Sequence, residues 1–295
     1  MNSGATLHAA LHSRRGVAFL VVIATTLCSG CGSTDEEPRV PRPFVMVEGE
    51  EVVHHTPLAM LNVTRRGEGL IVAPSSVLST PKLTCTQLPM GSCFVETCTR
   101  ESGSTDYGIA SVEMMSGPNT YSSSSTETTV EPADFWEPGA PIMLRLSASE
   151  SPAKAPFADT ELRGPPPLQL SSPTLAPSRS GPPGAKALEL RVDREFVASW
   201  SPVAAAMVFV SLTCTNESMG TTWWAQVRCE VDSDAGEVRV PTELIDYLPG
   251  PHCNFTLVTR AAATVIAPGQ FFEFNVRRIA QTAEGVDAHG GLVLR

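Results

Sequence analysis

Alternating apolar residues run through the C-terminal part of this chain, and they limit its fold more than any other feature. Every second residue is apolar or cysteine in residues 196–200, 208–214, 223–231, 238–240, 253–257 and 272–276. A period of two buries one side of a segment and leaves the other in water, which is the pattern of an antiparallel strand. Short strands of this kind, separated by turn signals, predict an all-β fold of antiparallel β-sandwiches.

The N-terminal part is less regular, but it also favours strands. Strands are predicted at residues 44–48, 69–73, 93–97, 109–115, 141–147 and 168–171, and residues 121–126 (YSSSST) are predicted to form a polar loop. The 25 Pro and 22 Gly are spread along the chain, where they separate short strands. The turn Pro138-Gly139 precedes one predicted strand much as Pro268-Gly269 precedes another, which suggests a distant repeat of one sandwich.

Residues 186–283 resemble a fibronectin-III or Ig-like domain. The resemblance rests on residues 196–202 (FVASWSP) and on the turn at residues 248–250 (LPG). It implies that Trp200 fills the core and that the turn leads into a penultimate strand starting at Cys253. Phe255 stands where that strand usually carries a Tyr.

The first 30 residues have the three parts of a secretory signal peptide. Arg14 and Arg15 are followed by the apolar run of residues 16–27 (GVAFLVVIATTL), which is shorter than the roughly 20 residues of a membrane-spanning helix. The signal therefore predicts export of the chain.

The end of this segment, Ser29-Gly30-Cys31, resembles a bacterial lipobox, although Cys28 occupies the usual Leu position. The resemblance implies that Cys31 is lipidated and anchors the chain to a membrane; the alternative is ordinary cleavage that leaves a secreted protein. Gly32 follows Cys31 where an Asp would retain the protein in the inner membrane, which implies the outer membrane of a Gram-negative envelope. As a whole the chain resembles uncharacterised two-domain β-sandwich surface lipoproteins, which implies a location and a fold but no activity.

A proline-rich stretch divides the chain into two predicted domains, because such stretches are extended and semi-rigid. The predicted organisation is a signal peptide at 1–30, the lipidated Cys31 with a flexible tether at 31–43, an N-terminal β-sandwich at 44–163, a Pro-rich linker at 164–185, an Ig-like β-sandwich at 186–283 and a tail at 284–295.

Six cysteines remain beyond the signal segment, three in each predicted domain: Cys85, Cys93, Cys98, Cys214, Cys229 and Cys253. An even number in an exported chain predicts disulfides. The Ig-like resemblance implies that Cys214 lies beside Cys253, a pairing favoured over Cys229–Cys253, and it leaves Cys229 as a buried thiol.

In the first predicted domain, Cys93–Cys98 and Cys85–Cys93 are nearly equal alternatives. If no disulfide crosses between the domains, each keeps one free thiol. No close C-x₂-C pair is present, so the spacing argues against a zinc site, and no metal or cofactor is predicted.

Composition and motifs favour a binding or structural role over catalysis. The chain has 21 Lys and Arg against 31 Asp and Glu, which argues against nucleic acid as a partner. No G-x-S-x-G or phosphate-binding Gly-rich motif is present. We therefore expect a non-enzymatic, lipid-anchored surface module with an unknown protein partner. The alternative is a glycan-binding or adhesion module that uses Trp224 and Phe271, which face away from the predicted core; an enzyme with a loop-assembled site is the weakest hypothesis.

Overall fold

The structure is a computed structural model, and it describes residues 44–295 apart from 53–58, 67–68, 74–78, 107–108, 124–127, 131–134, 149–155, 178–184, 205, 219–220, 251 and 268–269. The predicted signal peptide, the lipidation site Cys31 and the tether lie outside the described residues. The chain is 66% strand with one minor helix among these residues, so the all-β prediction is confirmed. No described helix is long and apolar enough to cross a membrane.

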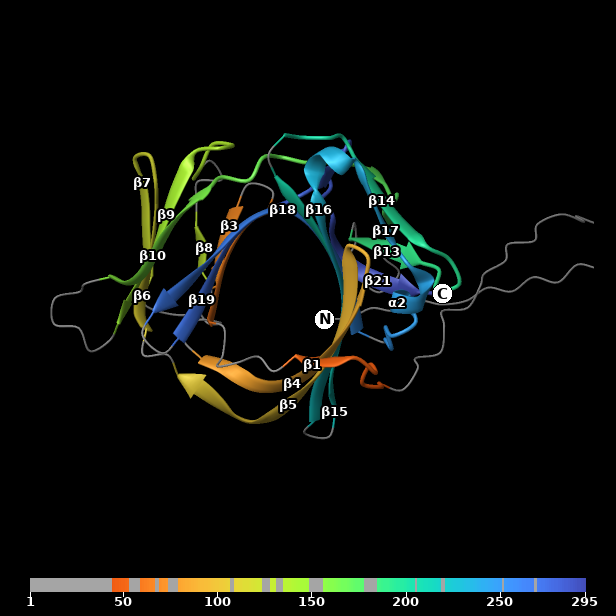
Figure 1. Ribbon diagram of the computed structural model, residues 1–295. Helices are drawn as coiled ribbons and strands as arrows, with labels where there is room; N and C mark the ends of the chain where they lie inside the picture. Colours follow the sequence, from red (N-terminus) through yellow and green to blue (C-terminus); the bar gives the residue numbers. More distant parts are fainter. Residues whose placement is uncertain are drawn as a thin grey trace, which may run out of the picture. The chain divides into compact units, whose positions relative to one another are not determined.

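The strands form three largely antiparallel sheets (Figure 1). Sheet A contains β1 (Glu50–Val52), β2 (Ala59–Arg66), β3 (Gly69–Ala73), β4 (Ser79–Met90), β5 (Cys93–Asp106), β8 (Thr128–Val130), β12 (Ala176–Pro177), β13 (Lys186–Leu190), β15 (Met207–Ser218), β16 (Thr221–Asp232), β18 (His252–Ala267), β19 (Gln270–Ile279) and β21 (His289–Leu294). Sheet B contains β6 (Ile109–Ser116), β7 (Asn119–Ser123), β9 (Pro141–Ala148) and β10 (Pro156–Arg163). Sheet C contains β11 (Gln169–Ser172), β14 (Phe196–Trp200), β17 (Glu237–Val240) and β20 (Gln281–Thr282).

Sheet A interleaves strands from both predicted domains. Its main path runs β1-β4-β5-β16-β15-β18-β19-β2-β3-β8. The antiparallel pair β5–β16 and the parallel pair β19–β2 therefore join strands from opposite sides of the proline-rich stretch. The predicted domain boundaries do not separate the strand pairing, and residues 37–295 form one compact unit.

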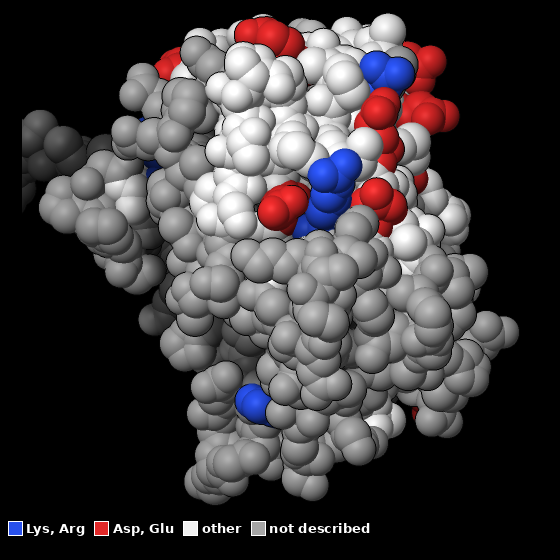
Figure 2. All heavy atoms as spheres, turned by 90° about the vertical axis from the view of Figure 1, so that its left-hand side faces the viewer, with Lys and Arg blue, Asp and Glu red and all other residues white. Residues whose placement is uncertain are grey.

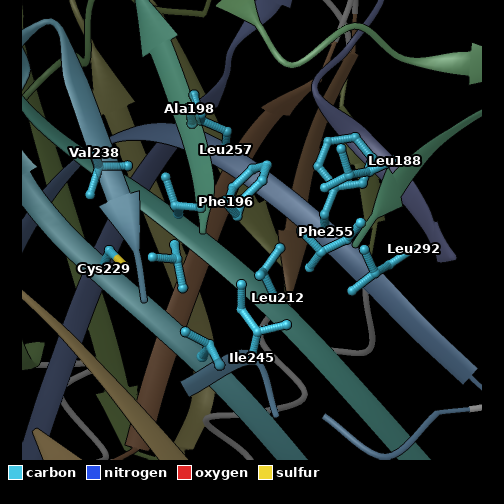
Figure 3. Close-up of a cluster of buried hydrophobic side chains, with 14 of the residues drawn as sticks. Leu188, Phe196, Ala198, Leu212, Cys229, Val238, Ile245, Phe255, Leu257 and Leu292 are labelled. Atoms are coloured by element: carbon cyan, nitrogen blue, oxygen red, sulfur yellow. The ribbon is translucent and has the colours of Figure 1, made fainter. Parts of the chain in front are cut away.

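Two hydrophobic cores lie on the same side of sheet A. The first is packed between sheet A and sheet C and includes Trp200, Leu212 and Phe255 (Figure 3). The second is packed between sheet A and sheet B and includes Trp136, Leu144 and Phe274. The path of sheet A is strongly curved, and the two smaller sheets lie on its convex side (Figure 1). The opposite, concave face of sheet A carries a third, smaller hydrophobic cluster, formed by Phe209, Val258 and Ile279.

The predicted alternation of the C-terminal part is confirmed. In β15, Val208, Val210, Leu212 and Cys214 are all buried, as the period of two predicts. Trp200 is also buried, as the Ig-like resemblance implies, and its indole Nε1 donates a 2.7 Å hydrogen bond to the Ser233 carbonyl oxygen. The half-buried Trp223 stacks on Phe44 with ring centroids 4.6 Å apart.

Predictions for the N-terminal part are less accurate. Predicted strands at 69–73, 93–97, 109–115, 141–147 and 168–171 correspond to β3, β5, β6, β9 and β11. The strand predicted at 44–48 is wrong, because pairing begins only at Glu50. The loop predicted at 121–126 is wrong in its first half, since residues 121–123 belong to β7 and pair with β6. Sequence reasoning also missed β2, β4 and β10.

Both the proline-rich stretch and the C-terminal tail contribute to the folded sheets. Leu168, Leu170 and Leu175 are buried in the first core, and β11 pairs with β14. The predicted tail contains β21, which pairs in parallel with β13 and antiparallel with β18. The strand predicted at 168–171 corresponds to β11, whereas the rest of the proline-rich stretch was predicted as a linker and residues 284–295 as a tail.

Candidate ligand-binding face

The concave face of sheet A carries an unusual concentration of charge. Strand alternation places there the residues that lie between the core positions of β5, β15, β16, β18 and β19. They are Phe94, Glu96, Phe209, Ser211, Thr213, Trp224, Gln226, Arg228, Glu230, Thr256, Val258, Arg260, Glu273, Asn275, Arg277 and Ile279. The strand register brings these positions together from segments far apart in the sequence.

Phe209 lies among three arginines on this face. The guanidinium carbons of Arg228, Arg277 and Arg260 lie 4.8, 5.6 and 5.7 Å from the centroid of its ring. Arg228 also lies 5.3 Å from the ring centroid of Phe94. The negative face of an aromatic ring attracts cations within about 6 Å, so Phe209 holds the three side chains in one place.

Arg260 is fully compensated by its neighbours. Its Nε donates a 2.6 Å hydrogen bond to Asn275 Oδ1, and its terminal nitrogens pair with Glu230, at 3.1 Å, and with Glu273. The Arg260 side chain is 8% exposed, and Glu273 is also largely buried at 16%. This network therefore fixes β18, β19 and β16 relative to one another.

Arg228 and Arg277 are compensated less completely, because Glu230 and Glu273 attract both side chains without forming an ion pair with either. Among the described residues, neither forms an ion pair, and the buried Nε of each has no hydrogen-bond partner. Burial and then repulsion by Arg260 and Arg228 lower the pKa of Arg277 to about 10. Burial and Arg260 also lower the pKa of Arg228. An unsatisfied buried donor costs about 1–3 kcal/mol, so the fold sustains an unfavourable arrangement at this position.

Each disulfide joins residues that are directly opposite on adjacent strands of sheet A. Cys214 pairs with Cys253, the pairing that the Ig-like resemblance favours. The other expectations are corrected, because Cys85 pairs with Cys98 and Cys93 pairs with Cys229. Cys229 is thus not a free thiol, and one disulfide does cross between the predicted domains. The register of β5 explains the difference, since Cys93 lies opposite Cys229 on β16 and Cys98 lies opposite Cys85 on β4.

The two predicted binding aromatics lie far apart. Trp224 of β16 is half-buried on the concave face. It lies opposite Thr215 of β15, which in turn lies opposite His252 at the start of β18. Phe271 is in register with Ile266, at the other end of β18, and its side chain lies outside the described residues. At roughly 3.3 Å per residue, the two positions are about 45 Å apart along the curved path of β18. Their union in one apolar patch stays a prediction.

A second candidate site is a cleft of about 560 Å³ beside sheet C. It lies between the β11–β12 connection and the β20 turn, with Lys186 and Glu284 at its rim and Leu170 and Leu175 at its base. Its volume suits a small ligand. Most of its polar groups are exposed, however, and none combines burial with an unsatisfied hydrogen bond as the concave arginines do.

Acidic and basic side chains alternate on the outer face of sheet B, so this face carries no field of one sign (Figure 2). In register across it, Arg145 of β9 lies between Glu113 of β6 and Asp159 of β10. Opposite charges at neighbouring positions stabilise a sheet modestly.

One group of potential metal ligands occurs within the described part of the chain, namely Cys85, Glu96 and Cys98. Its two sulfur atoms are joined in a disulfide, so neither is a thiolate that could bind a metal.

Sequence reasoning missed the arginine cluster. Arg228, Arg260 and Arg277 come from three separate strands, and each is surrounded in sequence by core residues. Alternation with buried residues does indicate that each arginine lies on the face of its strand opposite the hydrophobic core. Only the order of the strands in sheet A shows that the three arginines lie close together. No known protein family and no curated protein matches this sequence.

Proposed function

We propose that the protein is an exported, lipid-anchored module of the bacterial envelope that binds a partner and catalyses no reaction. The observation that carries this proposal is that all six cysteines beyond the signal segment are paired in disulfides. Such bonds persist in oxidising compartments outside the cytosol. They suggest an extracytoplasmic protein, as the signal segment predicts.

A rigid binding face supports the interaction role. The Arg260 network and the Cys85–Cys98 and Cys93–Cys229 disulfides link neighbouring strands around the concave face of sheet A. Preorganised groups on a rigid sheet lose little entropy when they bind a partner. The concave face is therefore the surface through which we expect binding.

The anchor is tested by fractionating cells that express the native chain, Cys31→Ser and Cys28→Ser, and by measuring the mass of each mature N-terminus. We expect an acylated Cys31 in the membrane fraction for the native chain and for the Cys28→Ser control. Cys31→Ser should be neither acylated nor retained in that fraction. Soluble, unacylated protein from all three chains would contradict the lipoprotein proposal and would leave a secreted or periplasmic binding protein.

A further inference from the structure

We propose that Arg228 and Arg277 bind a small oxyanion, a carboxylate or a phosphate or sulfate group, beside Phe209 on the concave face of sheet A. This inference goes beyond the envelope role above and does not depend on the lipid anchor.

Three cations lie around the ring of Phe209, and among the described residues only Arg260 of the three forms ion pairs. Arg260 engages Glu230, Glu273 and Asn275. Arg228 and Arg277 engage the ring of Phe209, and the Nε of each is buried without an acceptor. A ring orients a guanidinium but accepts no conventional hydrogen bond from its edge, so the Nε–H of both side chains remains to be satisfied.

The surroundings of Arg228 and Arg277 disfavour their charge on balance, although Glu230 and Glu273 attract both side chains. Burial and then repulsion by Arg260 lower the pKa of both, and Arg228 adds to the effect on Arg277, which means that the folded protein disfavours their charged forms. An anion between them would oppose both effects. Costly, preorganised charge of this kind is typical of a functional site.

The shape of the guanidinium groups and the nearby glutamates limit which anion fits. A guanidinium presents N–H groups in a planar fork that matches two oxygens of a carboxylate, phosphate or sulfate, and such charge-assisted bonds are strong. Glu96, Glu230 and Glu273 act on Arg228 electrostatically and stand on the same face, so they repel additional negative charge. The site therefore favours a small anion of low charge over a polyanion.

The experiment is a calorimetric titration of the purified, processed protein with inorganic phosphate, sulfate and acetate, each at constant ionic strength set with chloride. We expect saturable binding of at least one of the three. Tetrahedral and planar anions in separate arms show whether phosphate-type or carboxylate chemistry is preferred.

Variants assign the binding to these two residues. Arg228→Gln and Arg277→Gln should each weaken binding at least about tenfold, as the loss of a charge-assisted hydrogen bond implies. Arg277→Lys keeps the charge and loses the fork, so it should weaken binding and provides a test should the Gln variant fail to fold. Arg239→Gln is the matched control, because Arg239 is exposed on sheet C and paired with Glu195 and Glu237; it should bind as the native protein does.

Two results would overturn the proposal. The first is no saturable binding of any of the three anions by native protein whose circular dichroism shows a folded sheet. The second is equal weakening in Arg239→Gln and Arg277→Gln, which would mean that the anions respond to net charge alone.

Discussion

Cys93 of β5 and Cys229 of β16 lie directly opposite one another with their Cα atoms 4.0 Å apart, and their disulfide spans 136 positions of the sequence. It connects strands on either side of the proline-rich stretch, within a sheet that both parts of the chain build.

The three disulfides should stabilise the fold to different extents. Their sequence separations are 136, 39 and 13 residues for Cys93–Cys229, Cys214–Cys253 and Cys85–Cys98. Loop entropy then predicts losses of about 5, 4 and 3 kcal/mol when each pair is replaced by alanine. Urea unfolding of the three double variants measures the order. A larger loss for the Cys85–Cys98 variant than for the Cys93–Cys229 variant would contradict the loop-entropy explanation.

Peptide mapping without reduction should reveal that a disulfide joins the parts of the chain before and after the proline-rich stretch. Trypsin cleaves after Lys82, Arg100, Arg228 and Arg239, so Cys93 and Cys229 fall on peptides 83–100 and 229–239. We expect these two peptides to migrate as one linked species that separates on reduction. Peptide 229–239 found alone and alkylated at Cys229 would show that the thiol is free and that the crossing disulfide does not form.

Breaking the buried ion pair of Arg260 should destabilise the protein. Glu273→Gln removes the carboxylate that pairs with a side chain only 8% exposed, although Glu230 remains as a second partner. Loss of one partner of a buried pair costs about 3–5 kcal/mol, and the remaining partner places our expectation near about 3 kcal/mol. Thermal and urea unfolding measure this loss in the free energy of unfolding. Glu195→Gln, which removes a partner of the exposed Arg239, serves as the control and should change stability little.

Arg277→Met should have the opposite effect. The substitution keeps much of the side-chain packing against Phe209 and removes a cation that burial and two neighbouring arginines disfavour. We expect a gain of about 1–2 kcal/mol, as is common when a costly functional residue is replaced. The measurement is the melting temperature in buffer free of oxyanions. A loss of stability would instead show that Arg277 is a structural residue of the concave face.

Trp200→Phe tests the buried indole of the first core. The substitution leaves the Ser233 carbonyl oxygen without the 2.7 Å bond from Nε1, in a fully buried position. The expected cost is about 1–3 kcal/mol. Urea unfolding measures this loss in the free energy of unfolding. Trp223→Phe is the matched control, and we expect a smaller loss because the variant keeps an aromatic ring that can stack on Phe44.

The sequence predicted most of the C-terminal strands because their burial has a clear period. Val208, Val210, Leu212 and Cys214 recur with a period of two, so one face of β15 could be assigned without knowing its partners, although Phe209 on the other face is also apolar. By contrast, β4 was missed because its sequence, STPKLTCTQLPM, contains two prolines and several polar residues. Its burial depends on pairing with β5, which local patterns do not show.

The same reasoning explains the errors at the cysteines and at the candidate site. Cys214–Cys253 follows from an arrangement within one domain, whereas Cys93–Cys229 requires that β5 and β16 be neighbours. Arg228, Arg260 and Arg277 likewise meet only because β16, β15, β18 and β19 are consecutive in sheet A. Alternation predicts which side of a strand a residue occupies, but long-range strand order decides which residues meet on that side.

The parallel pairing of β19 with β2 and of β21 with β13 has a consequence for how the chain is made. Early strands can pair fully only after late strands have been synthesised. β2 pairs with residues 272–278 of β19, and β13 pairs with residues 291–294 of β21. A chain emerging from its N-terminus would thus carry unpaired strand edges for nearly its whole length, and such edges invite pairing with other chains. We therefore expect its biogenesis to depend on chaperones that hold the nascent chain open until its last few residues arrive.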